Sequence, residues 1–250
     1  MKKEVLLFTS GLDSYIARDY LLSEDHDFDC LYFDHGGRYT KNEIARINKL
    51  DFHVIIDDRL KLGDLEQSDA HIPNRNILFT TLALSLGYEK VWLGGSLSDR
   101  VGDNKSEVYQ RYSELLTAVN SDYCRIDSPF YTCYKDDMVR WWVKRHSSDR
   151  LDLAKKTFSC FEPLDESYSS EITIQGFNSE FNTDECLCCS ACFRKCAVLW
   201  AGDIFIFFKN KYILKQYKHQ FEKSLIETPR SLGTMSYIKR WYEELDDNKS

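Results

Sequence analysis

The sequence has little proline and glycine, with 4 and 11 in 250 residues, and it has no long uninterrupted apolar run. So few chain breakers beside 43% hydrophobic residues exclude a disordered or low-complexity chain and indicate an ordered globular protein. The apolar runs fall short of a membrane span of about 20 residues, and no N-terminal stretch fits a signal peptide. These absences predict a cytoplasmic protein without membrane association.

Acidic residues outnumber basic ones: the chain has 40 Asp and Glu and 33 Lys and Arg, for a formal net charge of −7. This balance disfavours broad electrostatic adhesion to nucleic acid, although a local basic groove is compatible with it. A small-molecule substrate is therefore the default expectation.

The first half of the chain alternates strand-like and helix-like segments. Short apolar runs separate stretches whose apolar residues recur with a helical period. This alternation predicts an α/β fold with a doubly wound parallel sheet. After residue 157 the sequence becomes rich in Cys, Ser and Glu and loses a clear period, which predicts a small C-terminal zinc subdomain. We expect an ATP-binding domain at residues 1–157 and the subdomain with a C-terminal extension at residues 158–250. The expected strands lie at 5–8, 29–33, 53–56, 91–93 and 125–127, and the helices at 14–22, 40–50, 76–86, 106–119 and 135–145.

The segment after the first apolar run has the chemistry of a phosphate-binding loop. It reads Phe8-Thr9-Ser10-Gly11-Leu12-Asp13-Ser14, where a strand feeds a helix through small residues. Such a turn gathers backbone N–H groups and the positive end of a helix, and its hydroxyls add further donors for phosphate. Asp13 is expected to cap the helix, to bind magnesium or to do both. An ordinary capped turn has similar residues, so the segment by itself fits either a phosphate loop or a plain helix start.

Two arginines stand where strand-to-helix loops are expected. Arg38 ends the segment Phe33-Asp34-His35-Gly36-Gly37-Arg38, and Arg75 lies in Ile72-Pro73-Asn74-Arg75-Asn76. A guanidinium fork binds phosphate or carboxylate through two parallel hydrogen bonds, and the Asn76 amide offers a donor and an acceptor to a base edge. Either arginine could instead form a surface ion pair with an acid such as Glu43.

Five of the nine cysteines fall within residues 186–196, which indicates a metal site more than disulfides in a reducing compartment. Cys186-x2-Cys189-x2-Cys192 has the spacing of zinc ligands, and Cys160 supplies a fourth thiolate. Cys188 and Cys196 are extra thiols, so the spacing alone supports more than one ligand set. Four thiolates leave no open position on the ion, and the site is therefore expected to be structural.

These segments resemble the 7-cyano-7-deazaguanine synthase family, a branch of the ATP-pyrophosphatase (PP-loop) enzymes, over most of residues 4 to 200. The family loop Ser-Gly-Gly-x-Asp-Ser/Thr corresponds to Thr9-Ser10-Gly11-Leu12-Asp13-Ser14. Its Phe-Asp-Tyr-Gly-Gln-Arg and Val-Pro-Gly-Arg-Asn segments correspond to 33–38 and 72–76, and its Asp and Ser-Gly-Tyr-Pro-Asp run corresponds to 99–105. The resemblance selects Cys160, Cys186, Cys189 and Cys192 as the zinc ligands.

The resemblance implies that ATP with Mg²⁺ adenylates 7-carboxy-7-deazaguanine, that ammonia gives the amide, and that a second ATP leads to 7-cyano-7-deazaguanine. It also implies a homodimer, for which the apolar run at 204–208 is a candidate interface. The residues expected to bind the cofactor are Phe8, Thr9, Ser10, Gly11, Leu12, Asp13, Ser14, Arg38, Asn76 and Lys135, and those expected at the chemistry are Asp13, Ser14, Arg75 and Asp99.

Four departures from the family pattern keep different functions open. Thr9 and Ser10 replace Ser and Gly, Asp103-Asn104-Lys105 replaces Tyr-Pro-Asp, and 25 residues separate Cys160 from Cys186. The adenylated acid could instead pass to another amine on a protein acceptor or a nucleic acid. The chain could also be a tRNA-modifying PP-loop enzyme with Cys188 or Cys196 as its thiol, or a catalytically inactive zinc-bearing binding module.

Overall fold

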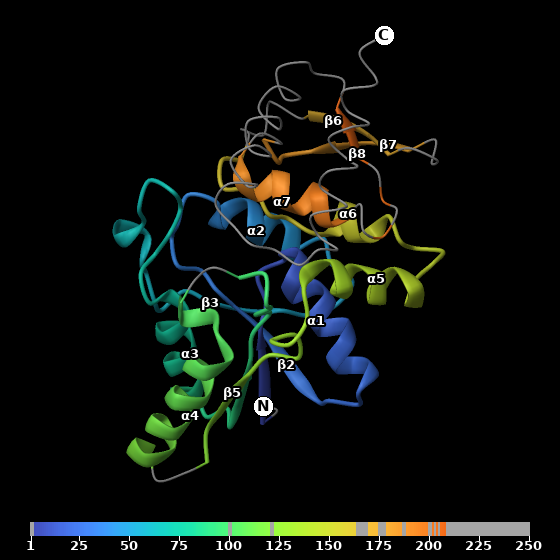
Figure 1. The fold of residues 1–250 in the computed structure, drawn as a ribbon. Coiled ribbons are helices and arrows are strands. Elements are labelled where there is room, and N and C mark those ends of the chain that lie inside the picture. Colours follow the sequence, from blue (N-terminus) through green and yellow to red (C-terminus); the bar gives the residue numbers. More distant parts are fainter. Residues whose placement is uncertain are drawn as a thin grey trace. The chain divides into compact units, whose positions relative to one another are not determined.

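A computed structural model describes residues 3–99, 102–120, 123–163, 170–174, 179–186, 189–199, 202, 204 and 206–208. The chain divides into two compact units, residues 1–135 and 136–250, and each is described by itself (Figure 1). These units do not test where the ATP-binding function ends, so the domain boundary after residue 157 remains a prediction. No helix in the described part of the chain is long and apolar enough to cross a membrane.

The first unit is built on a sheet of five parallel strands. The strands are β1 (Glu4–Leu7), β2 (Phe28–Phe33), β3 (Ile55–Asp57), β4 (Lys90–Trp92) and β5 (Arg125–Asp127), in the order β3-β2-β1-β4-β5. This order confirms the predicted α/β doubly wound fold. The helices between them are α1 (Leu12–Ser23), α2 (Thr40–Ile47), α3 (Arg75–Ser85) and α4 (Ser106–Asn120), with the short 3₁₀ turns η1 (Gly63–Leu65) and η2 (Gly102–Asn104).

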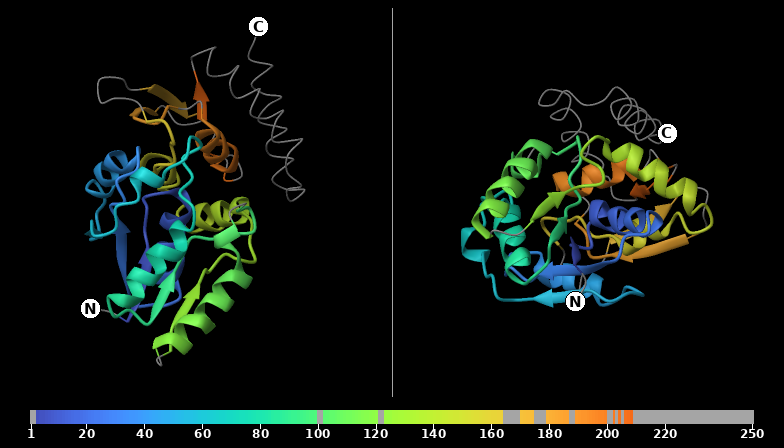
Figure 2. Two further views of the ribbon diagram at one scale, coloured as in Figure 1. Left: turned by 90° about the vertical axis from the view of Figure 1, so that its left-hand side faces the viewer. Right: turned by 90° about the horizontal axis from the view of Figure 1, so that it is seen from below.

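Both faces of the central strand β1 are covered by apolar side chains, as expected for a parallel sheet. Val5 and Leu7 face a buried cluster that includes Phe79 of α3 and Leu116 of α4. Right-handed crossovers place α1 and α2 on the opposite face, and Figure 2 shows α3 and α4 on one side of the strands and α1 on the other. The near-continuous apolar character of the strands follows from this burial on two faces.

The strand order fixes where a ligand is expected to bind. The chain runs from β1 outward to β3 and then returns to β4 on the other side of β1, so the order reverses between β1 and β4. Loops that follow these two strands diverge to opposite faces and leave a crevice at their carboxyl ends. The phosphate-loop segment follows β1, and the glycine-rich segment at 94–95 follows β4.

The second unit carries α5 (Lys135–Arg145, whose first residue belongs to the first unit), α6 (Asp152–Lys156), β6 (Ser170–Ile174), β7 (Ser179–Thr183), α7 (Ser190–Leu199) and β8 (Ile206–Phe208). Strands β6 and β7 form an antiparallel hairpin in the segment between Cys160 and Cys186. Strand β8 pairs with β6, so the apolar run at 204–208 contains a strand. Cys188 and residues 209–250 lie outside the described residues.

Candidate functional site

The loop after β1 turns sharply at Ser10, which has the left-handed backbone angle φ +53°. The Ser10 side chain is fully buried, and its Oγ has no hydrogen-bond partner among the described residues. A buried hydroxyl without a partner is costly, so its expected partner is a bound ligand. The next residue, Gly11, is the N-cap of α1, and the loop therefore lies at the positive end of a twelve-residue helix.

Hydroxyls inside the loop hold its shape. Ser14 Oγ donates to the Gly11 carbonyl at 3.1 Å and accepts the Thr9 backbone N–H at 3.2 Å. Helix α1 has no side-chain cap, which means that the expected capping role of Asp13 is wrong. Asp13 lies in the first helical turn, where its negative charge faces the positive helix end.

Lys135 joins the two loops that border the crevice. Its Nζ lies 2.5 Å from Asp13 Oδ2, after β1, and 3.1 Å from Asp99 Oδ1, after β4. Although burial disfavours the charged form, the two carboxylates raise the pKa of Lys135 above its usual range. The three side chains are only 16 to 28% exposed, so a persistent cation lies between two carboxylates at the edge of solvent.

Asp99 is held firmly by its own loop. Its Oδ2 accepts the Ser96 N–H at 2.8 Å, the Ser96 hydroxyl at 3.2 Å and the Asn104 amide at 2.8 Å. Tyr109 on α4 donates to Asn104, which fixes the orientation of that amide. Asn104 belongs to the residues that replace the family's Tyr-Pro-Asp, and here it positions the carboxylate of Asp99, one of the residues expected at the chemistry.

A glycine brings the β4 loop against the phosphate loop. A Cβ at Gly94 would lie 3.0 Å from the Asp13 Cβ and 3.2 Å from the Ser14 backbone nitrogen. These distances are tighter than about nine in ten observed Cβ contacts, so a larger residue would move the two loops apart by a few tenths of an ångström. Gly94 therefore permits the contact that puts Asp13 and Asp99 within reach of one lysine.

Helix α3 begins at Arg75, one residue before the predicted start at Asn76, and both residues have partners in the first unit. Arg75 Nη1 donates to the Tyr39 hydroxyl at 2.6 Å. The Asn76 backbone N–H and side-chain amide donate to the two carboxylate oxygens of Asp103 at 3.2 and 3.3 Å. Asp103 thus occupies the N-terminus of α3, the place at which Asn76 was expected to meet a base edge.

Arg38 is paired on several sides. Its backbone N–H donates to Glu66 at 2.9 Å, its Nε also bonds Glu66, and its Nη2 donates to the Gln67 carbonyl at 2.7 Å. Nearby, Lys61 Nζ donates to Asp34 Oδ2 at 2.8 Å, and this contact lowers the pKa of Asp34. The loop after β2 is therefore fastened to residues 61–68, and Arg38 pairs with Glu66 and not with the Glu43 considered in the sequence.

Helix α2 buries an acid and holds it with a phenol. Glu43 is 8% exposed, and its Oε2 accepts the Tyr32 hydroxyl at 2.7 Å. Burial raises the pKa of Glu43 to about 7. The His35 imidazole is also buried, and burial together with the charge of Arg75 lowers its pKa to about 4. Both side chains are therefore largely neutral near pH 6.

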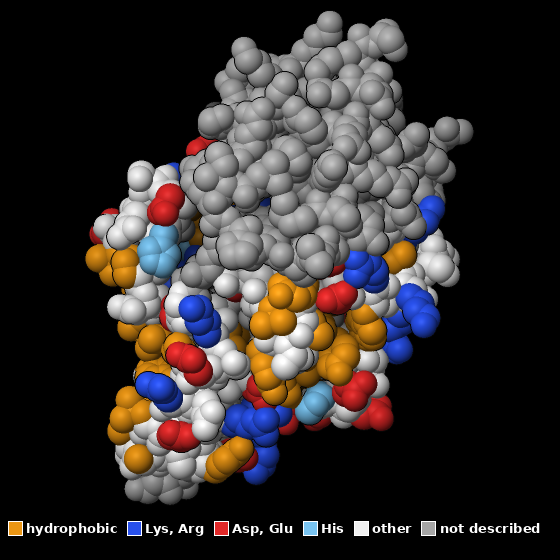
Figure 3. All heavy atoms as spheres, in the orientation of Figure 1, with side chains coloured by type: hydrophobic (Ala, Val, Ile, Leu, Met, Phe, Trp, Pro, Cys, Tyr) orange, Lys and Arg blue, Asp and Glu red, His pale blue; other side chains and the backbone are white. Residues whose placement is uncertain are grey.

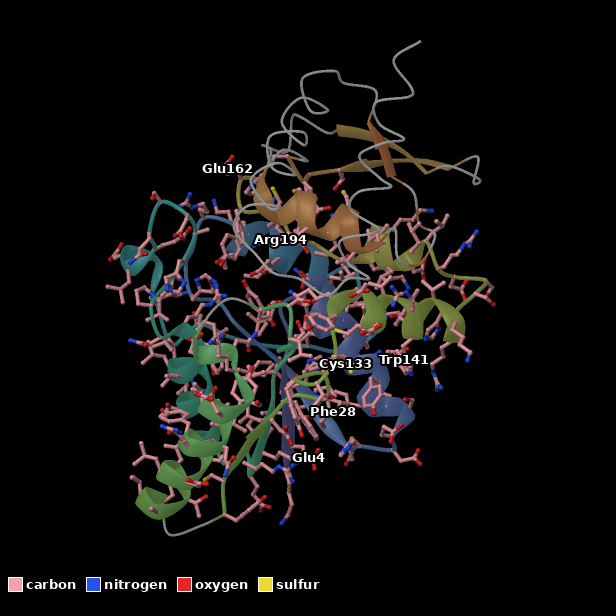
Figure 4. All side chains as sticks on the ribbon, in the orientation of Figure 1. Glu4, Phe28, Cys133, Trp141, Glu162 and Arg194 are labelled. Atoms are coloured by element: carbon pink, nitrogen blue, oxygen red, sulfur yellow. The ribbon has the colours of Figure 1, made fainter. Side chains whose placement is uncertain are left out.

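The second unit gathers the predicted zinc ligands. The sulfur atoms of Cys160, Cys186, Cys189 and Cys192 all lie within 4.8 Å of one another, and all four residues are buried. Thiolates on one zinc ion at about 2.3 Å are roughly 3.8 Å apart, close to the 4.0 Å between the sulfurs of Cys160 and Cys189. Glu162 and Arg194, labelled in Figure 4, mark the two segments that meet at this cluster.

A buried ion pair lies beside the cysteine cluster and was not foreseen from the sequence. Lys195 of α7 donates to Glu185 at 2.8 Å and to the Thr157 carbonyl at 2.7 Å, and these charged residues are 4 and 3% exposed. Glu185 also accepts the Ser159 backbone N–H at 2.7 Å. The pair ties the segment of Cys160 to that of Cys186.

On the face drawn in Figure 3, the acidic and basic side chains of the described residues are mixed.

The family model and the curated relatives indicate the same family. The family model described as queuosine biosynthesis protein QueC matches residues 50–200, a range that begins after the phosphate loop. Among curated proteins, 7-cyano-7-deazaguanine synthase 2 of Colwellia psychrerythraea is 24% identical over 192 residues, which cover 65% of this chain and 85% of the relative. The synthase of Thermoplasma volcanium is 24% identical over 213 residues, covering 70% of this chain and 86% of the relative. 7-Cyano-7-deazaguanine synthase 1 of Sulfurisphaera tokodaii is 27% identical over 173 residues, which cover 63% of this chain and 82% of the relative.

Proposed function

Because this chain belongs to the family described as queuosine biosynthesis protein QueC, we propose that it is an ATP-dependent ligase of 7-cyano-7-deazaguanine synthesis. ATP converts the carboxylate of 7-carboxy-7-deazaguanine to an acyl-adenylate and releases pyrophosphate. Ammonia then displaces AMP and gives the amide. A second ATP adenylates the amide oxygen, and loss of AMP with a proton leaves the nitrile.

The observation that best supports this proposal is the buried Ser10 hydroxyl without a partner among the described residues. It lies beside the N-terminus of α1 and one residue from Gly11, where backbone N–H groups are available to phosphate oxygens. The Lys135 ammonium lies 2.5 Å from Asp13, in the first turn after the loop, and so it borders the same crevice. Together these groups supply the donors and the cation that a leaving pyrophosphate requires.

The proposed roles follow from the donors and acceptors of each side chain. Phe8, Thr9, Ser10, Gly11, Leu12 and Ser14 form the phosphate loop, and Asp13 is an oxygen ligand suited to the Mg²⁺ that accompanies ATP. Asp99 accepts N–H groups of the deazaguanine ring, and Arg75 and Asn76 begin the helix that borders the substrate. Arg38 holds the loop after β2 in place. The four cysteines suit Zn²⁺ with no open position, which assigns them to folding and not to the reaction.

A product assay tests the proposal. Purified protein is incubated with 7-carboxy-7-deazaguanine, Mg²⁺-ATP and ammonium, and pyrophosphate release is measured while products are resolved by mass spectrometry. We expect pyrophosphate release that requires the acid, followed by amide and then nitrile. Amide without nitrile would restrict the enzyme to the first step, a conjugate with another amine would identify a transferase, and no acid-dependent release would contradict the proposal.

Ser10→Ala tests the observation on which the proposal rests. A hydrogen bond to a charged group contributes about 1.5 to 3 kcal/mol, so we expect kcat/KM for ATP to fall about tenfold to a hundredfold. Ser85→Ala is the matched control, because Ser85 is an exposed serine near the end of α3 whose hydroxyl bonds only within its own helix. Equal activity of the two variants would remove Ser10 from the phosphate site.

A further inference from the structure

We infer that Lys135 couples the nucleotide site to the substrate site, so that the nucleotide binds first and its phosphates draw the lysine away from Asp99. The inference rests on the proposed function, because it takes the phosphate loop and Asp99 as the two sites. It adds an order of binding and names the side chain that imposes it.

The coupling begins with a lysine shared between two loops. Lys135 Nζ lies 2.5 Å from Asp13, in the first turn after the phosphate loop, and 3.1 Å from Asp99 in the β4 loop. One cation therefore balances two carboxylates, and any ligand that attracts the cation changes the charge at both. The two loops border the crevice at which the strand order reverses, so a single lysine lies between the expected positions of both ligands.

Asp99 has one oxygen to offer a substrate, and Lys135 contacts it. The Oδ2 atom already accepts three hydrogen bonds, from the Ser96 N–H, the Ser96 hydroxyl and the Asn104 amide. The Oδ1 atom is the one that lies 3.1 Å from the lysine ammonium. An N–H donor on a deazapurine edge must therefore compete with a cation for Oδ1 when no nucleotide is bound.

A polyphosphate is suited to remove this competitor. The backbone of Lys135 is fixed by a 3.1 Å hydrogen bond from its N–H to Ser98 Oγ, while its four-carbon stem is flexible and its ammonium has three donors. A triphosphate at the Ser10 loop brings several negative oxygens close to Asp13, and the accompanying Mg²⁺ is a partner for the Asp13 carboxylate. The ammonium then moves to the phosphates, and Asp99 Oδ1 becomes available to the ring.

Calorimetric titration of the full-length protein tests the coupling without any substitution. The probes are 7-carboxy-7-deazaguanine and α,β-methylene ATP with Mg²⁺, an analogue that cannot release pyrophosphate. We expect the acid to bind at least tenfold more tightly when the analogue is saturating, and the analogue to gain the same factor from the acid, because coupling between two sites is reciprocal. Equal acid affinity with and without bound analogue would overturn the inference and leave the proposed function intact. Failure of the analogue to bind at all would count against the proposed function itself.

Lys135→Met identifies the residue responsible. Without the ammonium, Asp99 Oδ1 is open from the start, so we expect the acid to bind without nucleotide and the coupling factor to fall to about one, while the analogue binds more weakly. Lys49→Met removes the same charge from an exposed residue just after α2, away from both loops, and should leave the coupling unchanged. A Lys135→Met protein that keeps a tenfold coupling would overturn the inference. If that variant does not fold, Lys135→Arg, which keeps the charge, should retain the nucleotide dependence, and its loss there would equally overturn the inference.

Discussion

The two units of the chain each surround a lysine with acceptors, but they do so in opposite ways. In the first unit, Lys135 faces two carboxylates, and the three side chains are 16 to 28% exposed. In the second unit, Lys195 meets one carboxylate and the Thr157 carbonyl, and it is 4% exposed. The first group has an excess of negative charge and access to solvent, whereas the charges of the second are balanced and enclosed.

This difference separates a ligand site from a structural connection. An enclosed ion pair with complete hydrogen bonding gains nothing from a further ligand, and its loss leaves a buried charge. Lys135 is part-exposed and lies between two acids, one of them in the first turn after the loop of Ser10, whose hydroxyl has no partner in the described part of the chain; such a lysine has partners that a ligand can exchange. Substitutions in the second unit should therefore act mainly on stability, and those in the first mainly on binding.

Removal of a cysteine ligand should have the largest effect in the second unit. Metal binding in small zinc modules contributes on the order of 10 kcal/mol to folding. We therefore expect Cys160→Ala to release zinc, measured by elemental analysis, and to lower the unfolding temperature of the second unit. Cys133→Ala is the control, because this cysteine lies outside the buried cluster. One tightly bound zinc per chain in Cys160→Ala would show that the ligand set is wrong.

Loss of the enclosed Lys195 should have the next largest effect on the stability of the second unit. Lys195→Met leaves the Glu185 carboxylate buried without its cation, and breaking such pairs costs about 3 to 5 kcal/mol. Urea denaturation should show this loss, while the exposed Lys144→Met on α5 should stay within about 0.5 kcal/mol of the parent protein. Adding Glu185→Gln to Lys195→Met should recover part of the loss. An unchanged denaturation midpoint in Lys195→Met would mean that the pair does not connect the two cysteine segments.

The sequence was sufficient wherever local pattern or spacing decides structure. The period of apolar residues predicted the parallel sheet and its helices, and the spacing of Cys186, Cys189 and Cys192 predicted a cluster that the fold brings together. It could not reveal partners that depend on tertiary packing, such as Glu66 for Arg38, which is 28 residues away. Nor could it reveal that Asp103 occupies the start of α3 or that Lys195 pairs with Glu185, because isolated charges on polar segments are ordinarily solvated.

The smallest predicted effect compares two buried glutamates. Glu185 has a lysine as its partner, whereas Glu43 accepts a hydrogen bond from the neutral Tyr32 phenol. Burial raises the pKa of Glu43 from 4.5 to about 7, so between these values the unfolded chain loses the proton before the folded one does. Stability present at pH 4.5 is therefore lost as the pH rises to 7, by about 3 kcal/mol at 1.36 kcal/mol per pKa unit. Glu43→Gln cannot ionise, so its stability relative to the parent protein should increase by about this amount between pH 5 and pH 8 in urea denaturation. The exposed Glu107→Gln should show no such trend. If the stability difference between Glu43→Gln and the parent protein did not change with pH, Glu43 would be ionised in its pocket and balanced by Arg75, as Lys195 balances Glu185.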